Sequence, residues 1–279
     1  MPELPEVETV ANGLNLHVAG DVIESLWLGE KPEPLKSSPA EMAAVLEHSR
    51  IARVRRVGKH IVFDLERAGK GRKFAPSGQW IVHLGMTGSM LVTPPERELA
   101  KHTHAIARLA SGRELRFVDP RRFGRLAVVE IKDSGAGFAA PGSEPLLADL
   151  DSFIALFRGR KTPIKSALLN QKLLSGVGNI YADEALFRAG VRPRRRAASL
   201  TREELRKLHA GLKKVLREAI RKGGSTVRDY VDQDGKEGLF QLKHRVYGRE
   251  GLPCLVCGTP IKRIVIAGRS SHFCPHCQK

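Results

Sequence analysis

The stretches Cys254-Leu255-Val256-Cys257 and Cys274-Pro275-His276-Cys277 decide the fold of the last part of this chain. They contain all of its cysteines, and 16 residues separate the two pairs. Two Cys-x2-Cys pairs at this spacing are typical of a tetrahedral zinc site with four thiolate ligands. Four thiolates fill the coordination sphere, so we expect a structural zinc with neither His272 nor His276 as a ligand. Disulfides are disfavoured, because we expect a cytosolic protein and because every cysteine is confined to this element.

The segment between the two cysteine pairs is expected to form a β-hairpin. Ile261–Ile266 and Ser270–Phe273 have strand-like composition, and Arg269 falls in the turn between them. An arginine at the tip of a zinc-bound hairpin is well placed to bind a phosphate. A solvated turn without a ligand is the alternative interpretation.

The net charge of +17 lies entirely in the second part of the chain. Residues 1–152 contain 20 Lys and Arg against 20 Asp and Glu, whereas residues 153–279 contain 27 basic and 10 acidic residues. A neutral half joined to a strongly basic half indicates a polyanion partner, for which nucleic acid is the first candidate. A basic protein with solvated lysines is the alternative, but the run Arg192-Pro193-Arg194-Arg195-Arg196 favours phosphate contact.

The length and the composition limit the class of protein. A chain of 279 residues accommodates about two domains, and 42% hydrophobic with 28% charged residues is typical of a soluble globular protein. No apolar stretch approaches the roughly 18 residues that span a bilayer, and we find no signal segment. We therefore expect a cytoplasmic, nucleoid-associated protein without membrane contact. We also expect a monomer, because the sequence indicates neither a coiled coil nor an apolar stripe that would form a subunit interface.

Short strand-like runs follow one another in the first region, after a predicted helix over Glu6–Leu16. The runs are Val22–Leu28, Ile51–Val57, His60–Leu65, Trp80–Leu84, Ala105–Leu109, Glu114–Val118 and Leu126–Ile131. Repeated short strands with turn residues between them predict a β-sandwich or barrel. We therefore expect a domain over residues 1–133 and a Gly- and Pro-containing linker over residues 134–152.

The second region is predicted to be helical, which makes the fold class α+β. The predicted helices are Phe153–Phe157, Pro163–Leu174, Ile180–Arg188 and Arg202–Arg221, with Thr162 and Thr201 as N-caps. The glycine-containing turn Leu174–Asn179 offers backbone N–H groups to a phosphate, or is an ordinary connection between helices. We expect a helical domain over residues 153–239 that includes a mobile loop at 222–238, and a zinc hairpin over 240–279.

The segment Met1-Pro2-Glu3-Leu4-Pro5-Glu6-Val7-Glu8 contains an uncommon proline. Removal of Met1, which a small second residue normally permits, leaves Pro2 as a free secondary amine beside the carboxylate of Glu3. An N-terminal amine titrates near pH 8 (roughly 7.7–8.0), so it can attack a carbonyl carbon and form a Schiff base. From Pro5 onward the segment is explained as the first turn of a helix, but that explanation does not account for Pro2 and Glu3.

Three turn segments add candidate functional residues. Gly58-Lys59-His60 places a lysine at the start of a strand, and His83–Gly88 ends a strand in a turn that carries Met86. Asp119-Pro120-Arg121-Arg122-Phe123-Gly124 is a turn between strands that carries an arginine and an aromatic residue. Exposed Met and Phe can wedge between bases, and a nearby Arg can fill a space vacated in a duplex. Taken alone, each of these segments is more often part of a core or solvated than functional.

Together these motifs resemble one protein family. Pro2–Glu8, Asp119–Gly124, Gly178–Glu184 and the zinc hairpin are similar, in the same order, to bacterial formamidopyrimidine-DNA glycosylase, an 8-oxoguanine DNA glycosylase with AP-lyase activity. The resemblance is specific, because four independent motifs agree from residue 2 to the last cysteine. It implies a β-sandwich with an N-terminal helix, followed by a helix–two-turn–helix domain with a zinc-finger β-hairpin.

The resemblance implies chemical roles for matching residues. Pro2 matches the family's Schiff-base nucleophile, which attacks the sugar C1′, and Glu3 matches the catalytic acid. Glu6 matches a supporting carboxylate. Lys59 matches the proton donor in β-elimination, and Arg269 matches the finger arginine assigned to δ-elimination and phosphate binding.

The resemblance also implies residues that contact the duplex. Met86, Arg121 and Phe123 match the residues that fill the space left by an everted base. Other matching positions contact DNA (His102, Lys161 and Asn179) or lie near the lesion (Lys165, Thr226 and Tyr230).

The implied activity is excision of oxidised purines, such as 8-oxoguanine and formamidopyrimidines, from duplex DNA, followed by β,δ-elimination in base excision repair. The implied cofactor is one structural zinc, and the implied partner is double-stranded DNA containing oxidised purines.

Two alternatives remain open. An endonuclease VIII-type glycosylase for oxidised pyrimidines shares the proline, the turn motif and a zinc hairpin, although Leu4, Met86 and the Arg121–Phe123 pair favour the purine enzyme. A non-catalytic zinc-containing DNA-binding protein accounts for the charge and the cysteines but not for Pro2-Glu3 and Lys59.

Overall fold

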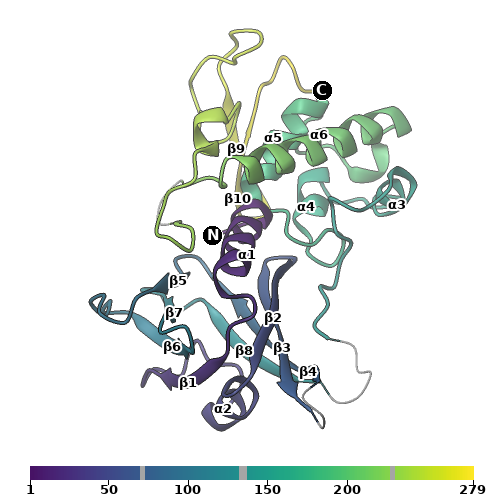
Figure 1. Cartoon of the computed structure of the whole chain (residues 1–279). Helices are drawn as coiled ribbons and strands as arrows, with labels where there is room; N and C mark the ends of the chain where they lie inside the picture. The colour runs from purple at the N-terminus through teal and green to yellow at the C-terminus, as the bar shows by residue number, and fades with distance from the viewer. Residues whose placement is uncertain (70–72, 132–136, 227–229) are drawn as a thin grey trace. The chain divides into compact units, whose positions relative to one another are not determined.

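A computed structural model of the chain describes residues 1–69, 73–131, 137–226 and 230–279 (Figure 1). Its contacts divide it into two compact units. The first unit contains Met1–Ala139 and Gly223–Gly238, and the second contains Ala140–Lys222 and Leu239–Lys279. The chain therefore returns to the first unit for a short segment before it ends in the second.

The first unit contains an antiparallel sheet with the strand order β2-β3-β4-β8. Its strands are β2 (Arg50–Val57), β3 (His60–Ala68), β4 (Phe74–His83) and β8 (Arg125–Glu130). Val57 pairs with His60, so a two-residue turn joins β2 to β3. Gly58 has a φ of +62° in this turn, a left-handed conformation that favours glycine. The hairpin thus places Lys59 at its tip.

A second antiparallel sheet has the strand order β1-β6-β7-β5. The remaining elements of this unit are α1 (Leu4–Val18), β1 (Ile23–Leu28), α2 (Pro39–Leu46), β5 (Ser89–Thr93), β6 (Thr103–Leu109) and β7 (Glu114–Val118). One buried apolar cluster includes Phe63 and Trp80 of the first sheet and Phe117 of the second. Leu14 of α1 and Met42 of α2 belong to the same cluster. Both sheets therefore share one core, as expected for a β-sandwich.

The second unit is mainly helical. Its elements are α3 (Leu150–Ala155), α4 (Ile164–Leu169), α5 (Asn179–Ala189), η1 (Ala197–Ser199), α6 (Arg202–Arg221), η2 (Phe240–Lys243), β9 (Lys262–Ile266) and β10 (Arg269–Phe273). α5 packs against α6 and against β10. α5 ends at Gly190, whose φ of +71° gives the left-handed C-cap that favours glycine.

The hairpin β9–β10 turns at Ala267 and Gly268, since Arg269 pairs with Ile266. Both turn residues have positive φ, as in the two-residue turns that match the twist of a β-hairpin. The predicted hairpin is confirmed, with Arg269 as the first residue of β10 beside the turn.

Several predicted boundaries need correction. α2 and β5 were not predicted, because their short apolar runs lack a clear period. α3 begins at Leu150 instead of residue 153, since Asp149 caps it through a hydrogen bond from the Ser152 N–H. The helix predicted over Pro163–Leu174 ends at Leu169, because Asn170 is extended and its side chain accepts the N–H two residues on, in an Asx turn.

The two predicted N-caps have different outcomes. Thr201 caps α6, where its hydroxyl accepts the Glu204 N–H at 3.2 Å and Glu204 accepts the Thr201 N–H in return. Thr162 does not cap α4, whose N-cap is Pro163. Among the described residues, no helix combines the length and the apolar composition needed to cross a membrane.

We expect Thr201→Ala to destabilise the protein by about 1 kcal/mol, through loss of the capping hydrogen bond. A change of this size lowers Tm by roughly 2–4 °C in calorimetry. Thr162→Ala is the matched control and should leave Tm almost unchanged. Equal losses in the two variants would contradict the cap assignment.

Candidate active site and metal centre

Residues 2–7 are buried at the start of α1. Pro2 is buried, and Glu3 is only 4% exposed at the N-cap position. The Glu3 N–H donates to Oε2 of Glu6 at 2.8 Å. The backbone next to Pro2 is therefore held by a carboxylate one turn further along the helix.

The same carboxylate reaches the segment Gly223–Gly238. Oε1 of Glu6 accepts the Ser225 N–H at 2.7 Å. A Cβ at Gly224 would lie 2.8 Å from Glu6, and its φ is +81°, so glycine permits this close approach. Burial and the Glu6 charge raise the pKa of Tyr230, which keeps its hydroxyl protonated as a donor to the Glu6 carbonyl oxygen at 3.3 Å. Glu6 thus joins the start of α1 to this segment.

Thr226 stabilises the same segment from within. Its hydroxyl accepts the Gly238 N–H at 2.9 Å and donates to the carbonyl oxygen of Tyr230 at 3.0 Å. Residues 227–229 of the expected loop lie outside the described residues. Ser225 and Tyr230, which lie on either side of residues 227–229 in the sequence, both form hydrogen bonds with Glu6.

Lys59 lies beside two histidines. It is 9% exposed, and the rings of His60 and His83 are 4.9 Å apart. Burial, then the charges of His60, Arg125 and Lys59, lowers the pKa of His83 to about 4. The pKa of His60 is also lowered, chiefly by burial. Both histidines are neutral near pH 7, so lysine and arginine supply the positive charge here.

A cavity of about 620 Å³ opens next to these histidines. Met86 and Phe123 line it, and they are 39% and 52% exposed. Its cationic lining residues are Lys36, Arg122 and Arg125. Exposed apolar side chains beside cations are suited to contact a base next to its phosphate.

Two turns bring Met86 and Phe123 to this cavity. Gly85 has a φ of +65°, and a Cβ on it would lie 2.5 Å from the Phe123 carbonyl carbon and the Gly124 nitrogen. The two turns therefore touch through their backbones, which only glycine permits. The Arg121 guanidinium lies 4.9 Å from the centre of the Phe123 ring, in a cation–π contact.

The buried carboxylate of Asp119 organises the second turn. It accepts the Gly124 N–H at 2.7 Å and the Arg121 N–H at 3.2 Å, as well as the Thr87 hydroxyl at 2.5 Å. The Asp119 N–H donates to the carbonyl oxygen of His102, whose side chain is exposed. Sequence reasoning assigned no role to Asp119, although an Asp-Pro pair opening a turn was a usable signal.

The remaining candidates lie in the second unit. Lys161 and Arg269 are exposed. Asn179 is the first residue of α5, and its Oδ1 has no hydrogen-bond partner among the described residues. Lys165 is 1% exposed, and its Nζ lies 2.7 Å from Oδ1 of Asp183. The structure thus gathers Pro2, Glu3, Glu6, Thr226 and Tyr230 around the start of α1. It buries Lys165 against α5 and β10.

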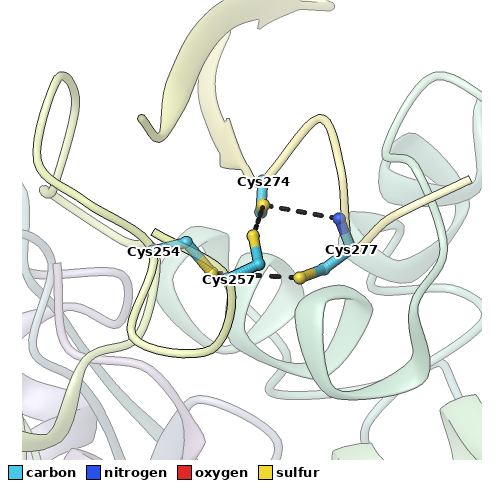
Figure 2. A group of neighbouring side chains, drawn as sticks. All are labelled: Cys254, Cys257, Cys274 and Cys277. Carbon is cyan, nitrogen blue, oxygen red and sulfur yellow. Dashed lines mark hydrogen bonds between the residues drawn. The ribbon is translucent and has the colours of Figure 1, made fainter. Parts of the chain in front are cut away.

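The four cysteine sulfurs converge on one point, as Figure 2 shows. They all lie within 4.8 Å of one another, with 3.9 Å between Cys254 and Cys277 and 3.5 Å between Cys257 and Cys274. Tetrahedral zinc with Zn–S bonds of about 2.3 Å separates its sulfurs by roughly 3.8 Å. A disulfide needs about 2.0 Å, and the cysteines are free thiols. The donor set and spacing therefore fit zinc.

Three family models match the chain in sequence order. They describe the formamidopyrimidine-DNA glycosylase N-terminal domain (residues 1–126), the formamidopyrimidine-DNA glycosylase H2TH domain (residues 141–231) and the zinc finger found in FPG and IleRS (residues 251–279). The chain belongs to the formamidopyrimidine-DNA glycosylase family. The predicted family, the predicted fold class and the predicted site for one structural zinc are confirmed.

Formamidopyrimidine-DNA glycosylases of known sequence match the chain from end to end. The chain is 44% identical over 279 residues to the protein of Solibacter usitatus and 43% identical over 287 residues to that of Thioalkalivibrio sulfidiphilus, with 100% of each chain covered. Among solved structures, MutM (Fpg) of Thermus thermophilus is 43% identical with a TM-score of 0.83, over 99% of this chain and 98% of that one. A Lactococcus lactis Fpg mutant in complex with Fapy-dG-containing DNA is 30% identical with a TM-score of 0.86, over 100% of both chains.

Cys274→Ser should abolish zinc binding, because it removes one of four thiolates. Zinc measured by mass spectrometry should fall from about one ion per chain to near zero, since binding at such sites is coupled to folding. His276→Ala is the control and should retain zinc, because His276 is exposed and lies outside the sulfur cluster. Zinc loss in the histidine variant alone would contradict the four-thiolate site.

Proposed function

We propose that this chain is a bifunctional DNA glycosylase and AP lyase that excises oxidised purines from duplex DNA. The proposed lesions are 8-oxoguanine and formamidopyrimidines, removed in base excision repair. The observation that carries the proposal is the buried start of α1, where Pro2 lies beside Glu3 and the backbone is held by Glu6. Full-length similarity to formamidopyrimidine-DNA glycosylases supports it.

Pro2 is the proposed nucleophile, once Met1 has been removed. Its secondary amine attacks C1′ of the damaged nucleotide and the bond between C1′ and the base breaks. Cleavage of the C1′–O4′ bond then opens the sugar ring, O4′ takes up a proton and an iminium is left between C1′ and Pro2. Glu3 is the proposed acid, because its carboxyl group adjoins the amine. The iminium withdraws electrons from the sugar and acidifies the C2′ proton, so strand cleavage can follow by elimination. Lys59 is the proposed proton donor in β-elimination.

Glu6 is proposed to support this chemistry through position. Its carboxylate accepts from the Glu3 N–H and from the Ser225 N–H, which fixes the acid and the loop together. Thr226 and Tyr230 belong to the same segment and are proposed to border the lesion. The lesion preference is therefore proposed to depend on residues 225–230.

Met86, Arg121 and Phe123 are proposed to fill the gap left when the lesion leaves the stack. Eversion costs a few kcal/mol, and stacking on an inserted side chain offsets part of that cost. The exposed side chains of Met86 and Phe123, with the guanidinium of Arg121 against the Phe123 ring, support this role.

The phosphate contacts are proposed to come from exposed or helix-terminal residues. His102, Lys161 and Arg269 are exposed, and Asn179 opens α5, where backbone N–H groups favour an anion. The excess of 17 positive charges supports a duplex partner. Arg269 is also proposed to serve δ-elimination.

The domain assignment is part of the proposal. A catalytic domain covers residues 1–133, a linker residues 134–152, a helix–two-turn–helix domain residues 153–239 and a zinc finger residues 240–279. Within the third of these ranges, the segment Gly223–Gly238 packs with the first unit. The zinc closes its coordination sphere with four thiolates, so it stabilises the finger and takes no part in the reaction. We further propose that the protein acts as a cytoplasmic, nucleoid-associated monomer.

Pro2→Gly should reduce excision of 8-oxoguanine and borohydride trapping by at least about 100-fold, because the secondary amine is lost. Duplexes with 8-oxoguanine opposite cytosine and with thymine glycol are the substrates, and gel assays give the rates. Pro5→Ala is the matched control, since Pro5 lies inside α1 and carries no reacting group. A higher rate on thymine glycol than on 8-oxoguanine would favour an endonuclease VIII-type enzyme, and no adduct in wild type would favour a non-catalytic DNA-binding protein.

Phe123→Ala should slow excision from duplex DNA by roughly tenfold, since base–aromatic stacking contributes about 1–3 kcal/mol. A single-stranded lesion has no opposing strand and no gap to stabilise, so its excision should change much less. Leu16→Ala, at an exposed position of α1, is the control for loss of an apolar side chain. Equal losses on both substrates would argue against the gap-filling role.

A further inference from the structure

A buried ion pair links two helices of the second unit. Nζ of Lys165 in α4 lies 2.7 Å from Oδ1 of Asp183 in α5, and the two side chains are 1% and 0% exposed. Burying both charges has a large desolvation cost, which is offset only when further hydrogen bonds satisfy the remaining donors and acceptors. The partners of these two groups therefore indicate what the pair holds in place.

The further partners are in strand β10. Nζ of Lys165 donates to the carbonyl oxygen of Ser270 at 2.6 Å. Oδ2 of Asp183 accepts the His272 N–H at 2.8 Å and lies 3.3 Å from Nδ1 of the same residue. The side chain of Ser271, between these two anchored residues, belongs to the buried part of the strand. The ion pair thus holds β10 by its backbone on both sides of one residue.

The carboxylate of Glu184, the residue after Asp183, holds the segment that precedes the zinc finger. Oε1 of Glu184 accepts the successive N–H groups of residues 245, 246 and 247 at 2.9, 2.9 and 3.1 Å. Burial raises the pKa of Glu184, and these N–H donors oppose that shift. Asp183 and Glu184, which we call the α5 acid pair, therefore anchor both the segment before the finger and its hairpin.

Arg269 directly precedes the anchored Ser270. It is exposed and stands at the end of β10 nearest the turn, where it pairs with Ile266. Its Cα is fixed by the anchored strand, whereas its guanidinium is free to face solvent. The anchored strand therefore determines where this guanidinium is presented.

We propose that Asp183, paired with Lys165, is a positioning residue for Arg269. It sets where the zinc hairpin presents that guanidinium to a DNA phosphate, and Lys165 acts through this pair instead of touching DNA. This inference rests on the proposed phosphate-binding role of Arg269. It assigns the zinc and the α5 acid pair different tasks, because the zinc closes the finger while the acids fix it to the helices.

The test is a double-mutant cycle between Asp183→Asn and Arg269→Ala. Asp183→Asn preserves shape and removes the charge. It should raise KM for an 8-oxoguanine duplex about tenfold and change kcat by no more than about twofold. Here kcat is expressed per enzyme molecule that is competent for borohydride trapping. Arg269→Ala should raise KM similarly, and the double variant should match Arg269→Ala alone. Glu203→Gln, which breaks an exposed ion pair with Arg206 in α6, is the control and should behave as wild type.

Hydrogen exchange in the absence of DNA measures how firmly the hairpin is held. Amides of residues 262–273 should exchange at least about tenfold faster in Asp183→Asn than in wild type, with zinc still bound. His272→Ala keeps the backbone N–H that Asp183 accepts and removes the contacts of the imidazole ring with Asp183 and with the Tyr247 ring. It should shift KM and exchange in the same direction, and it carries the test if Asp183→Asn does not fold.

Unchanged hairpin exchange, or KM effects that multiply in the double variant, would overturn the inference. A fall in kcat at unchanged KM would also overturn it. Failure of the proposed function has another signature, which is absence of the borohydride adduct in wild type.

Discussion

The structure of the candidate active site depends on one carboxylate, that of Glu6. One oxygen accepts the Glu3 N–H and the other accepts the Ser225 N–H, although these residues are more than two hundred positions apart in the sequence. Because the chain folds back at Gly223–Gly238 to reach this carboxylate, the first turn of α1 cannot shift without moving the loop. A reactive amine needs such restraint, since a terminal residue is otherwise among the most mobile parts of a chain. Glu6 thus converts a chain terminus into a defined position.

Buried carboxylates organise the other functional segments in the same way. Asp119 gathers the N–H groups of a turn and so presents Arg121 and Phe123. The α5 acid pair accepts backbone N–H groups from the segment before the zinc finger and from its hairpin. In each case the acid accepts hydrogen bonds from backbone donors that would otherwise be buried without partners, which is strongly unfavourable. These acidic residues therefore fix the backbone, while the exposed cations of the protein are available to bind a polyanion.

The sequence predicted the features that follow from local spacing. Cysteine spacing identified the zinc site, and strand-like runs identified the hairpin that carries Arg269 and most of the sandwich. The cap of α6 was also predictable, because Thr201 and Glu204 form a local capping box. Thr162 looked equally suitable but does not cap, since α4 begins one residue later at an N-cap proline. Local pattern alone does not distinguish these two cases.

The features that the sequence did not predict depend on partners that are distant in sequence. Neither the Lys165–Asp183 pair nor its contacts with β10 could be inferred from spacing, because they join elements that only the tertiary fold brings together. An acid on a helix in an otherwise basic region was the available signal for Asp183. Likewise, Gly85 had no evident role until its closeness to Phe123 was known.

The most direct test of the account is to map the residue that bonds to DNA. The borohydride-reduced adduct with an 8-oxoguanine duplex can be digested and sequenced by tandem mass spectrometry, with the intact mass of the unreacted protein recorded in parallel. The account predicts that the sugar remnant is on the nitrogen of Pro2 and that molecules retaining Met1 stay unreacted. An adduct on a lysine side chain, or strand cleavage by protein that keeps Met1, would contradict it.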